Sequence, residues 1–374
     1  MLWIGNGEIM DERIKKLSKT IVEYSVNIKE NDKVLIQYEN DICKPLIKCL
    51  IKDIYSKNGI PFVKLLDNEL NSMIMENANS KTIDSIVKFK EFEVNNIDVF
   101  IRICYNENEY EDKNIKSSIR KELGKKSEML DDIRINKRRW TLLNYPSIMD
   151  AYKAHMTYDE FYNYSLDVMT INYKEMSEKI KPLKDLMECT DKVRILGPNT
   201  DLTFSIKGLP AISCCGTANI PDGEVYTAPV KDSVNGVITY NTPSPYHGNI
   251  FNDIRLEFKD GKIVKCESKE NSDKLEEIFN TDEGSRYVGE FSFGLNPKIN
   301  KPMGYILYDE KIMGSIHFTP GTCYADCDNG NKSSVHWDLV LIQTPEYGGG
   351  EIYFDDVLIR KDGKFVLDEL KDLN

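Results

Sequence analysis

The length, composition and charge of this chain restrict what it can be. Its 374 residues are many for a single hydrophobic core, so we expect two domains. The net charge of −12, from 49 basic and 61 acidic side chains, argues against a nucleic-acid partner and against an anionic membrane surface. No apolar run is long enough to cross a membrane, and the first residues lack a signal-peptide pattern. Nine scattered cysteines, an odd number, favour free thiols and a cytoplasmic location.

Helices and strands alternate in the first half of the sequence. Apolar spacing predicts helices over 8–26, 43–59 and 177–186, and in the charged segment between 105 and 140. Apolar and β-branched runs predict strands over 33–39, 61–67, 97–105 and 140–146. Thr157 and Glu160 have the spacing of a capping box, which predicts a helix start. A strand, a helix and a second strand in succession favour a parallel sheet.

After residue 190 the sequence changes to short strands separated by Gly, Asn, Asp and Pro. The predicted strands include RILGPN, DLTFSIKG, GVITYN, YVGEF, MGYILY, SIHF and DLVLIQT, and one helix is predicted over 272–279. FKDGKIV and IRKDGKFV are hairpin signals. The predicted fold class is therefore α/β. An N-terminal α/β domain with a mostly parallel sheet, over 1–190, precedes a β-rich α+β domain over 191–374.

Two of the four histidines lie in this second domain with a nearby aspartate. His336 and Asp338 are two residues apart in VHWDLVLI, a run that predicts a strand. Residues i and i+2 of a strand project from one face, so an imidazole and a carboxylate would lie side by side. His317 ends another predicted strand, in GSIHF. Two strands that present His, His and Asp to one point are a plausible site for a metal such as zinc.

Two glutamates upstream lie in unusual surroundings for charged side chains. Glu224, in NIPDGEVYTAPV, and Glu290, in YVGEFSFGLNP, each follow a glycine and precede an apolar residue. Carboxylates in such apolar contexts are poor candidates for a solvated surface and plausible metal ligands.

The residues alone also allow other sites. His336 and Asp338 could be a surface pair, and His317 could be an ordinary hydrogen-bonded histidine. In a non-catalytic binding protein, Cys323 and Cys327 could join the two histidines around one structural zinc ion, although the CxxxC spacing is less usual than CxxC.

A mononuclear iron oxygenase is a further alternative. His317, His336 and Asp338 would form its facial triad, and Glu224 and Glu290 would then have no role.

Three other motifs have simpler interpretations. Cys214 and Cys215 are expected to pack in the core near a turn, and Glu310 is most simply a solvated turn residue. The GNG motif at 5–7 precedes a helix but follows no strand, so it is a very weak dinucleotide fingerprint.

Four motifs in order resemble one enzyme family. They are NIPDGEVYTAP (219–229), GEFSFGLNP (289–297), DEKIMGSIHFTPGTCY (309–324) and VHWDLV (335–340). Together they resemble the thermophilic aminopeptidase family of metallopeptidases, the aminopeptidase T, S and PepS group (family M29). Supporting segments at 138–162 and 197–208 extend the resemblance over most of the chain.

The resemblance implies a metal-dependent aminopeptidase that removes N-terminal residues from peptides with a free N-terminus. It implies five metal ligands, which are Glu224, Glu290, His317, His336 and Asp338. Tyr324 matches the active-site tyrosine of the family, so Tyr324 and Glu290 would take part in catalysis. Glu310 is a possible further match, at a different offset from His317. The family also implies a homodimer whose cavity encloses the active sites.

The chemistry of these residues agrees with that implication. Three carboxylates and two imidazoles can hold two divalent ions, with zinc expected and cobalt, manganese or magnesium as alternatives. Such a pair of ions activates a water molecule as the nucleophile. Cys323 and Cys327 are expected not to bind these ions. HFTPG and the cysteine-containing loop after it differ from the family pattern, which leaves substrate preference open.

Overall fold

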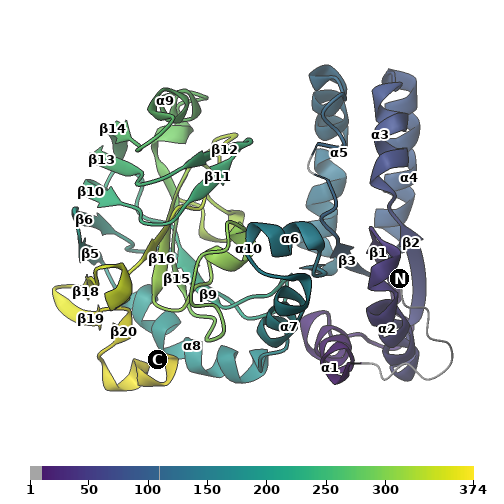
Figure 1. The fold of residues 1–374 in the computed structure, drawn as a ribbon, viewed down its shortest axis with the longest axis horizontal. Coiled ribbons are helices and arrows are strands. Elements are labelled where there is room, and N and C mark those ends of the chain that lie inside the picture. Colours follow the sequence, from purple (N-terminus) through teal and green to yellow (C-terminus); the bar gives the residue numbers. More distant parts are fainter. Residues whose placement is uncertain (1–10, 109) are drawn as a thin grey trace. The chain divides into compact units, whose positions relative to one another are not determined.

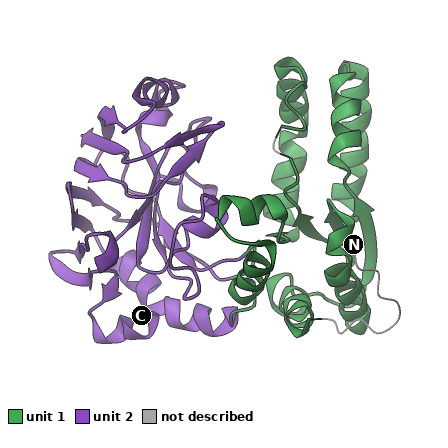
Figure 2. Cartoon of the chain, viewed as in Figure 1, with its two compact units in different colours: residues 1–171, 216–220 green, residues 172–215, 221–374 purple. Residues whose placement is uncertain are grey.

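The structure, a computed structural model, describes residues 11–108 and 110–374 and divides into two compact units (Figure 1, Figure 2). The first contains residues 1–171 and 216–220, and the second contains residues 172–215 and 221–374. Helix α8 (Tyr173–Cys189) belongs to the second unit, although it precedes the sequence-predicted boundary at 190. The GNG motif at 5–7 and the start of the predicted helix over 8–26 lie outside the described residues.

A five-stranded parallel sheet forms the centre of the first unit. Its strand order is β2-β1-β3-β4-β8, and all four pairings are parallel. The strands are β1 (Lys33–Tyr38), β2 (Ile60–Leu65), β3 (Val99–Cys104), β4 (Arg139–Asn144) and β8 (Asn219–Ile220). The four longer ones lie where the sequence predicted strands, so the prediction of a parallel N-terminal sheet is confirmed.

Seven α-helices of the first unit surround this sheet in the described part of the chain. They are α1 (Glu12–Thr20), α2 (Lys44–Ser56), α3 (Asn68–Glu76), α4 (Ser80–Asn96), α5 (Ser117–Lys137), α6 (Ile148–Lys153) and α7 (Tyr158–Met169). A π-helical turn, Ile21–Ser25, continues α1. The capping box at the start of α7 is present, with Thr157 and Glu160 bonding reciprocally. Helices α3 and α4 were not predicted from the sequence, because Ile83 and Val94 are their only buried apolar residues and the apolar stripe over 68–96 is weak.

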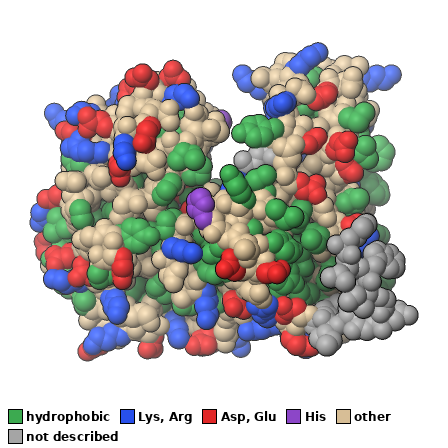
Figure 3. Space-filling view, viewed as in Figure 1, with side chains coloured by type: hydrophobic (Ala, Val, Ile, Leu, Met, Phe, Trp, Pro, Cys, Tyr) green, Lys and Arg blue, Asp and Glu red, His purple; other side chains and the backbone are tan. Residues whose placement is uncertain are grey.

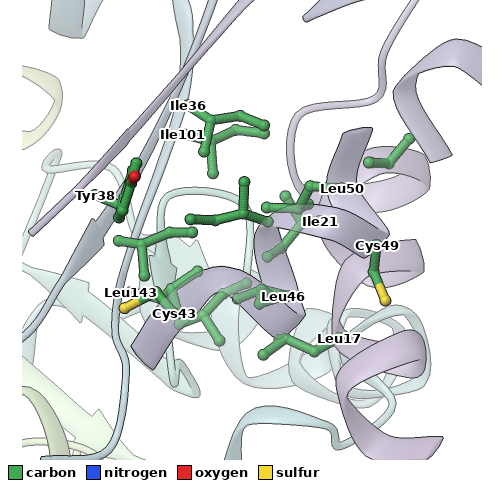
Figure 4. Close-up of a cluster of buried hydrophobic side chains, with 14 of the residues drawn as sticks. Leu17, Ile21, Ile36, Tyr38, Cys43, Leu46, Cys49, Leu50, Ile101 and Leu143 are labelled. Atoms are coloured by element: carbon green, nitrogen blue, oxygen red, sulfur yellow. The ribbon is translucent and has the colours of Figure 1, made fainter. Parts of the chain in front are cut away.

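Alternation along the parallel strands supplies a core on each face of the sheet. Val34 and Ile36 point into one cluster, together with the apolar faces of α1, α2 and α7 (Figure 4). Leu35 and Phe100 point into a second cluster with residues of α4 and α5. Strands that are buried on both faces are typical of parallel sheets covered by helices.

The second unit consists mainly of two antiparallel sheets. The larger has the order β14-β13-β10-β6-β5-β18-β19-β20. Its strands are β5 (Lys192–Gly197), β6 (Thr200–Ser205), β10 (Asn235–Thr239), β13 (Arg255–Lys259), β14 (Lys262–Glu267), β18 (Glu351–Phe354), β19 (Val357–Lys361) and β20 (Lys364–Phe365). The predicted hairpins are confirmed at Asp260-Gly261 and Asp362-Gly363, where both residues of each pair have positive φ, as a tight hairpin turn requires.

The smaller sheet has the order β17-β16-β15-β9-β7. Its strands are β7 (Ile212–Cys214), β9 (Glu224–Thr227), β15 (Val288–Gly294), β16 (Ser315–Pro320) and β17 (Val340–Ile342). A separate hairpin joins β11 (Ser244–Tyr246) and β12 (Asn249–Phe251). The helices are α8, α9 (Ser272–Phe279) and α10 (Ile306–Asp309), and short 3-10 turns lie at Gly284–Arg286, Ala325–Cys327, Pro345–Tyr347 and Asp368–Leu373. The predicted β-rich second domain is thus confirmed.

One predicted strand of this unit is wrong, and another is shorter than predicted. MGYILY (303–308) leads into the helical turn α10, because Asp309 accepts hydrogen bonds from the backbone N–H groups of Met303 and Tyr305 and curls the segment. The predicted strand VHWDLVLI begins only at Val340. His336 makes one isolated bridge to Gly321, and the two segments pair irregularly there, since Gly321 adopts a positive φ of 112°.

Two surface observations bear on partners. On the face that Figure 3 shows, acidic and basic side chains are interspersed. Among the described residues, no helix combines the length and the apolar character needed to span a bilayer.

Candidate metal centre

Three neighbouring strands of the smaller sheet place acidic and imidazole side chains on one face. Glu224 begins β9 opposite Gly294, and His317 in β16 lies opposite Ser292 of β15. Glu290 precedes Ser292 by two residues in the regular part of β15, next to a bulge between Val288 and Glu290, so it shares that face. This register brings the side chains of Glu224, Glu290 and His317 close to one another.

Glu290 lies between the two histidines. Its Oε1 is 3.1 Å from His317 Nε2, and its Oε2 is 3.3 Å from His336 Nε2. Glu224 Oε2 is 3.4 Å from the same nitrogen of His317, and Asp338 Oδ1 is 3.3 Å from that of His336. All five predicted ligand side chains are therefore in one cluster.

Hydrogen bonds on the outer side of the cluster orient these groups. His317 Nδ1 lies 3.2 Å from the carbonyl oxygen of Glu310, and His336 Nδ1 lies 2.9 Å from that of Thr322. Because a carbonyl only accepts, each Nδ1–H donates and each Nε2 is left facing the carboxylates. The Thr319 hydroxyl donates to Asp338 Oδ1 at 2.8 Å. Such outer contacts are typical of metal-binding histidines and carboxylates.

The cluster is buried at one end and open at the other. The exposed side-chain fraction is 1% for His317, 4% for Glu290 and 9% for Glu224. It rises to 15% for Asp338 and 20% for His336. Among the described residues, His336 and Asp338 therefore form the end of the cluster that is most accessible to a reacting molecule.

The buried charges shift one another's protonation strongly. Burial raises the pKa of Glu224 to about 8. Burial lowers the pKa of both histidines, but the hydrogen bond of His317 to Glu290 and the negative charges of Asp338 and Glu290 around the two rings outweigh it. The pKa of His317 rises to about 10 and that of His336 to about 12. Although burial opposes it, the neighbouring His336 and His317 lower the pKa of Asp338. The surplus of carboxylate groups thus favours a cation, either a protonated imidazole or a metal ion, within this cluster.

The donor set fits metal ions. Glu224, Glu290 and His317 offer ligand atoms within 4.8 Å of one another, and so do Glu290, His336 and Asp338. Nitrogen and oxygen donors in threes are the usual ligands of catalytic zinc. His336 Nε2 is buried without a hydrogen bond, as expected of an atom whose partner is a metal ion. Glu290 belongs to both groups.

Glu310 was predicted to be a solvated turn residue, but its side chain lies largely buried beside the cluster. Its side chain is 13% exposed and pairs with Lys311 Nζ. Lys311 is completely buried, and its Nζ is also 3.5 Å from Glu224 Oε1. Within the described part of the chain, Glu310 belongs to neither ligand group around Glu290. A further group, Cys214, Asp222 and Glu224, adjoins the first.

Tyr324 lies at the open end. Its ring centroid is 4.8 Å from that of His336 and 5.4 Å from that of Tyr226, and 45% of the residue is exposed. Burial of the hydroxyl and the negative charge of Glu290 raise the pKa of Tyr324 well above its usual range, so the phenol keeps its proton and can donate it in a hydrogen bond.

The cysteines have other surroundings. Cys323 Sγ is 3.2 Å from Asp328 Oδ1, and Cys327 is buried against Tyr226 in a small apolar cluster. Of the described residues, no group of possible ligands combines these thiols with a histidine. Cys215 is buried and Cys214 packs against the same apolar cluster.

Sequence reasoning missed Lys311 and Thr319. In YDEKIMG, Lys311 has the pattern of a surface lysine, and only the fold reveals its burial. Thr319 could have been found, because it follows His317 by two residues in the strand SIHFTP and so shares its face.

Comparison with known proteins places this geometry in a family. Residues 10–365 match the family described as thermophilic metalloprotease (M29). Aminopeptidase AmpS of Bacillus subtilis (strain 168) is 26% identical over 372 residues, which cover 88% of each chain. Aminopeptidase T of Thermus aquaticus is 27% identical over 187 residues, or 43% of this chain and 44% of the relative.

Solved structures agree on the fold. AmpT from Thermus thermophilus superposes with a TM-score of 0.76 at 17% identity, over 95% of this chain and 99% of its own. The 2,5-dihydroxypyridine dioxygenase from Pseudomonas putida KT2440 reaches 0.62 at 13% identity, over 96% and 98%, so the same fold also occurs in a protein with a different name. The family resemblance and the metallopeptidase class predicted from the sequence are confirmed: this chain belongs to the thermophilic metalloprotease (M29) family.

Proposed function

We propose that this protein is an aminopeptidase that uses two divalent metal ions to hydrolyse the first peptide bond of peptides with a free N-terminus. Family membership supports metal-dependent peptidase chemistry, and the relatives named above are aminopeptidases.

The position of Glu290 is the observation that carries the two-metal proposal. One carboxylate oxygen faces His317 and the other faces His336. In our proposal, Glu224, Glu290 and His317 would hold one ion, Glu290, His336 and Asp338 would hold the other, and Glu290 would be shared by both. Zinc suits this nitrogen and oxygen donor set, with cobalt or manganese as alternatives and magnesium the least suited, because it rarely binds imidazole.

When bound, such a pair of ions supplies an activated water and polarises the scissile carbonyl. The chain's own residues supply the rest. Carbonyl acceptors hold both imidazoles in the tautomer that presents Nε2, and Thr319 holds Asp338. The free α-amine of a peptide is a possible ligand of one ion, which would favour cleavage at the N-terminus. Tyr324, protonated and at the open end, donates a hydrogen bond to the oxyanion that forms at the attacked carbonyl.

The facial-triad alternative fits the geometry less well. It needs His317, His336 and Asp338 around one iron, but the two histidines fall in separate ligand groups, each with carboxylates of its own. The structural-zinc alternative is also less well supported, because no possible ligand group among the described residues contains both a cysteine and a histidine.

The test combines metal analysis with a screen of aminoacyl fluorogenic substrates on purified protein. We expect two ions per chain and release of the fluorophore from unblocked aminoacyl groups, but not from N-acetylated ones. One tightly bound iron and oxygen consumption would contradict the proposal.

Glu290→Gln tests the bridging role. It should lower the metal content to one ion or none and abolish hydrolysis, because an amide cannot bridge two cations. Glu277→Gln on the exposed face of α9 is the matched control and should keep two ions and full activity. If the Glu290 variant still bound two ions, Glu290 would not be the bridging ligand.

We also propose a cytoplasmic homodimer. Support comes from β2, which lies at the edge of the parallel sheet with 47% of Phe62, 46% of Val63 and 47% of Leu65 exposed. Open edge strands with apolar side chains tend to be covered by another chain. Light scattering should show a dimer at micromolar concentration, and Val63→Lys should weaken it. A monomeric wild type would contradict this part of the proposal alone.

A further inference from the structure

A small apolar pocket adjoins the open end of the metal centre. It has a volume of about 170 Å³. Its apolar wall is formed by Pro243, Pro245, Tyr246, Ile306 and Trp337. His336 and Asp338 form one of its edges, and they are also the two most exposed members of the ligand cluster. Anything held at the open end of the cluster therefore has this pocket beside it.

The pocket is built rigidly. Trp337 stacks on Tyr246 with ring centroids 4.6 Å apart and meets Phe251 edge-on at 5.2 Å. The segment before Tyr246 is tied to β17, because the Thr242 hydroxyl donates to the Val340 carbonyl at 3.1 Å. Two prolines in this segment restrict its backbone further. A preformed wall loses little entropy when a ligand binds, which is the usual condition for selectivity.

Size and charge define the group that fits. Cavities of about 150 Å³ with apolar walls accept a benzene ring, so this pocket has room for an isobutyl or benzyl side chain. Asp338 at the edge repels acidic groups. Asp309 also lines the pocket, but its two oxygens accept from the backbone N–H groups of Met303 at 2.6 Å and Tyr305 at 3.2 Å. Asp338 is in turn engaged by the Thr319 hydroxyl and by His336, so neither carboxylate of the lining is left to pair with a basic side chain.

We propose that this pocket binds the side chain of the substrate's N-terminal residue and selects leucine or phenylalanine over small, acidic and basic residues. The inference rests on the proposed aminopeptidase function, because that function places the N-terminal residue at the cluster. Ile306, 39% exposed at the first position of α10, is the wall residue most open to change.

The principal test compares aminoacyl substrates in the wild type and in Ile306→Trp, which fills the pocket. The wild type should have a kcat/KM for Leu and Phe at least about 10-fold above that for Ala, since one or more methylenes in an apolar pocket are worth that much. In Ile306→Trp, the Leu and Phe values should fall about 10-fold or more, and the Ala value should stay within about 3-fold. Ile250→Trp on β12, at a residue 58% exposed and outside the pocket, is the matched control and should change none of them.

A second variant and a binding measurement keep the test independent of folding and of turnover. Ile306→Ala enlarges the pocket and should raise the kcat/KM for Trp relative to Leu. Calorimetry with the unreactive amino alcohols L-leucinol, L-phenylalaninol and L-alaninol, on the zinc-loaded protein, measures the same selectivity without hydrolysis. Ile306→Trp should weaken binding of the first two only.

The outcomes separate the pocket from the proposed function. Selectivity for leucinol and phenylalaninol without hydrolysis of any substrate would support the pocket and overturn the function. Hydrolysis with equal loss of Leu, Phe and Ala activity in Ile306→Trp would overturn the pocket and keep the function. A wild-type preference for Arg, Lys, Asp or Glu would also overturn it.

Discussion

Each unit of this molecule contains a five-stranded sheet, and the two sheets bury different chemistry. In β1 and β3 of the first unit, the buried side chains are apolar on both faces and pack against helices. In β15 and β16 of the second unit every residue is buried, and Glu290 and His317 are among them. Burial of ionisable groups costs free energy unless opposite charges or metal ions compensate it. The first sheet thus has an apolar core, whereas the second buries the charged cluster that we propose to bind metal ions.

The effect of pH on metal binding should be the largest difference between the sheets. The pKa values of about 8 for Glu224, about 10 for His317 and about 12 for His336 mean that all three hold a proton at pH 7 before metal binds. Ligands bind in the deprotonated form, so metal uptake releases these protons and weakens as pH falls, by up to about 10³ per pH unit for the full set. Calorimetry in buffers of different ionisation enthalpy counts the protons, and a count of zero would contradict this assignment.

Tyr324→Phe should separate chemistry from metal binding. Two ions should remain, and KM should change little, because the phenol contacts the transition state and not the ground state. Loss of one oxyanion donor typically lowers kcat by about 10²–10³. Steady-state kinetics with metal analysis measures both quantities. Loss of an ion would identify the phenol as a ligand, and an unchanged kcat would leave it only a packing role.

A core substitution in the first unit should do the opposite. Leu50 in α2 is completely buried in the cluster of Figure 4, so Leu50→Ala should lower the free energy of unfolding by about 2–5 kcal/mol. The metal content of the folded protein should not change. Leu70→Ala, at a residue 55% exposed in α3, is the control and should cost less than about 0.5 kcal/mol. Denaturant titration measures both, and metal loss in the Leu50 variant would argue against separate roles for the sheets.

The smallest of these effects should come from Thr319→Val. This change keeps the shape of the side chain and removes the hydrogen bond to Asp338 Oδ1. Loss of such an orienting contact typically lowers metal affinity by about 10–100-fold. Competition with a chromogenic chelator measures the change. Thr203→Val in β6, where the hydroxyl bonds only a backbone carbonyl of the larger sheet, should leave the affinity unchanged.

The sequence was informative where local chemistry determines structure. Apolar and β-branched runs predicted the four long strands of the parallel sheet, and the Asp-Gly pairs predicted two hairpins, because these turns require positive φ. Metal ligands could be proposed because carboxylates in apolar segments are rare, and the family resemblance joined Glu224 and Glu290 to His317. The structure brings all five candidates together.

The remaining features depend on contacts between distant residues. His336 and Asp338 lie side by side without a regular strand. Contacts with a distant segment hold them there, namely an isolated bridge between Gly321 and His336 and the hydrogen bond from His336 Nδ1 to the Thr322 carbonyl. The helical turn after Met303 depends on hydrogen bonds to Asp309. The burial of Lys311 depends on its ion pair with Glu224, which lies 87 positions earlier in the sequence. No local pattern encodes such pairings.

Lys311 has a consequence for the life of the protein before it acquires metal. Its ammonium group lies between Glu224 and Glu310 and neutralises part of the cluster from within the chain. The second unit can therefore complete its fold first and be loaded afterwards, unlike small zinc domains that fold only around their ion. Chelation should yield a folded, inactive and fully reloadable protein, and Lys311→Met should make that metal-free form unfold at a lower temperature. Newly synthesised molecules would then fold stably without metal, and the fraction that is active would depend on the metal concentration.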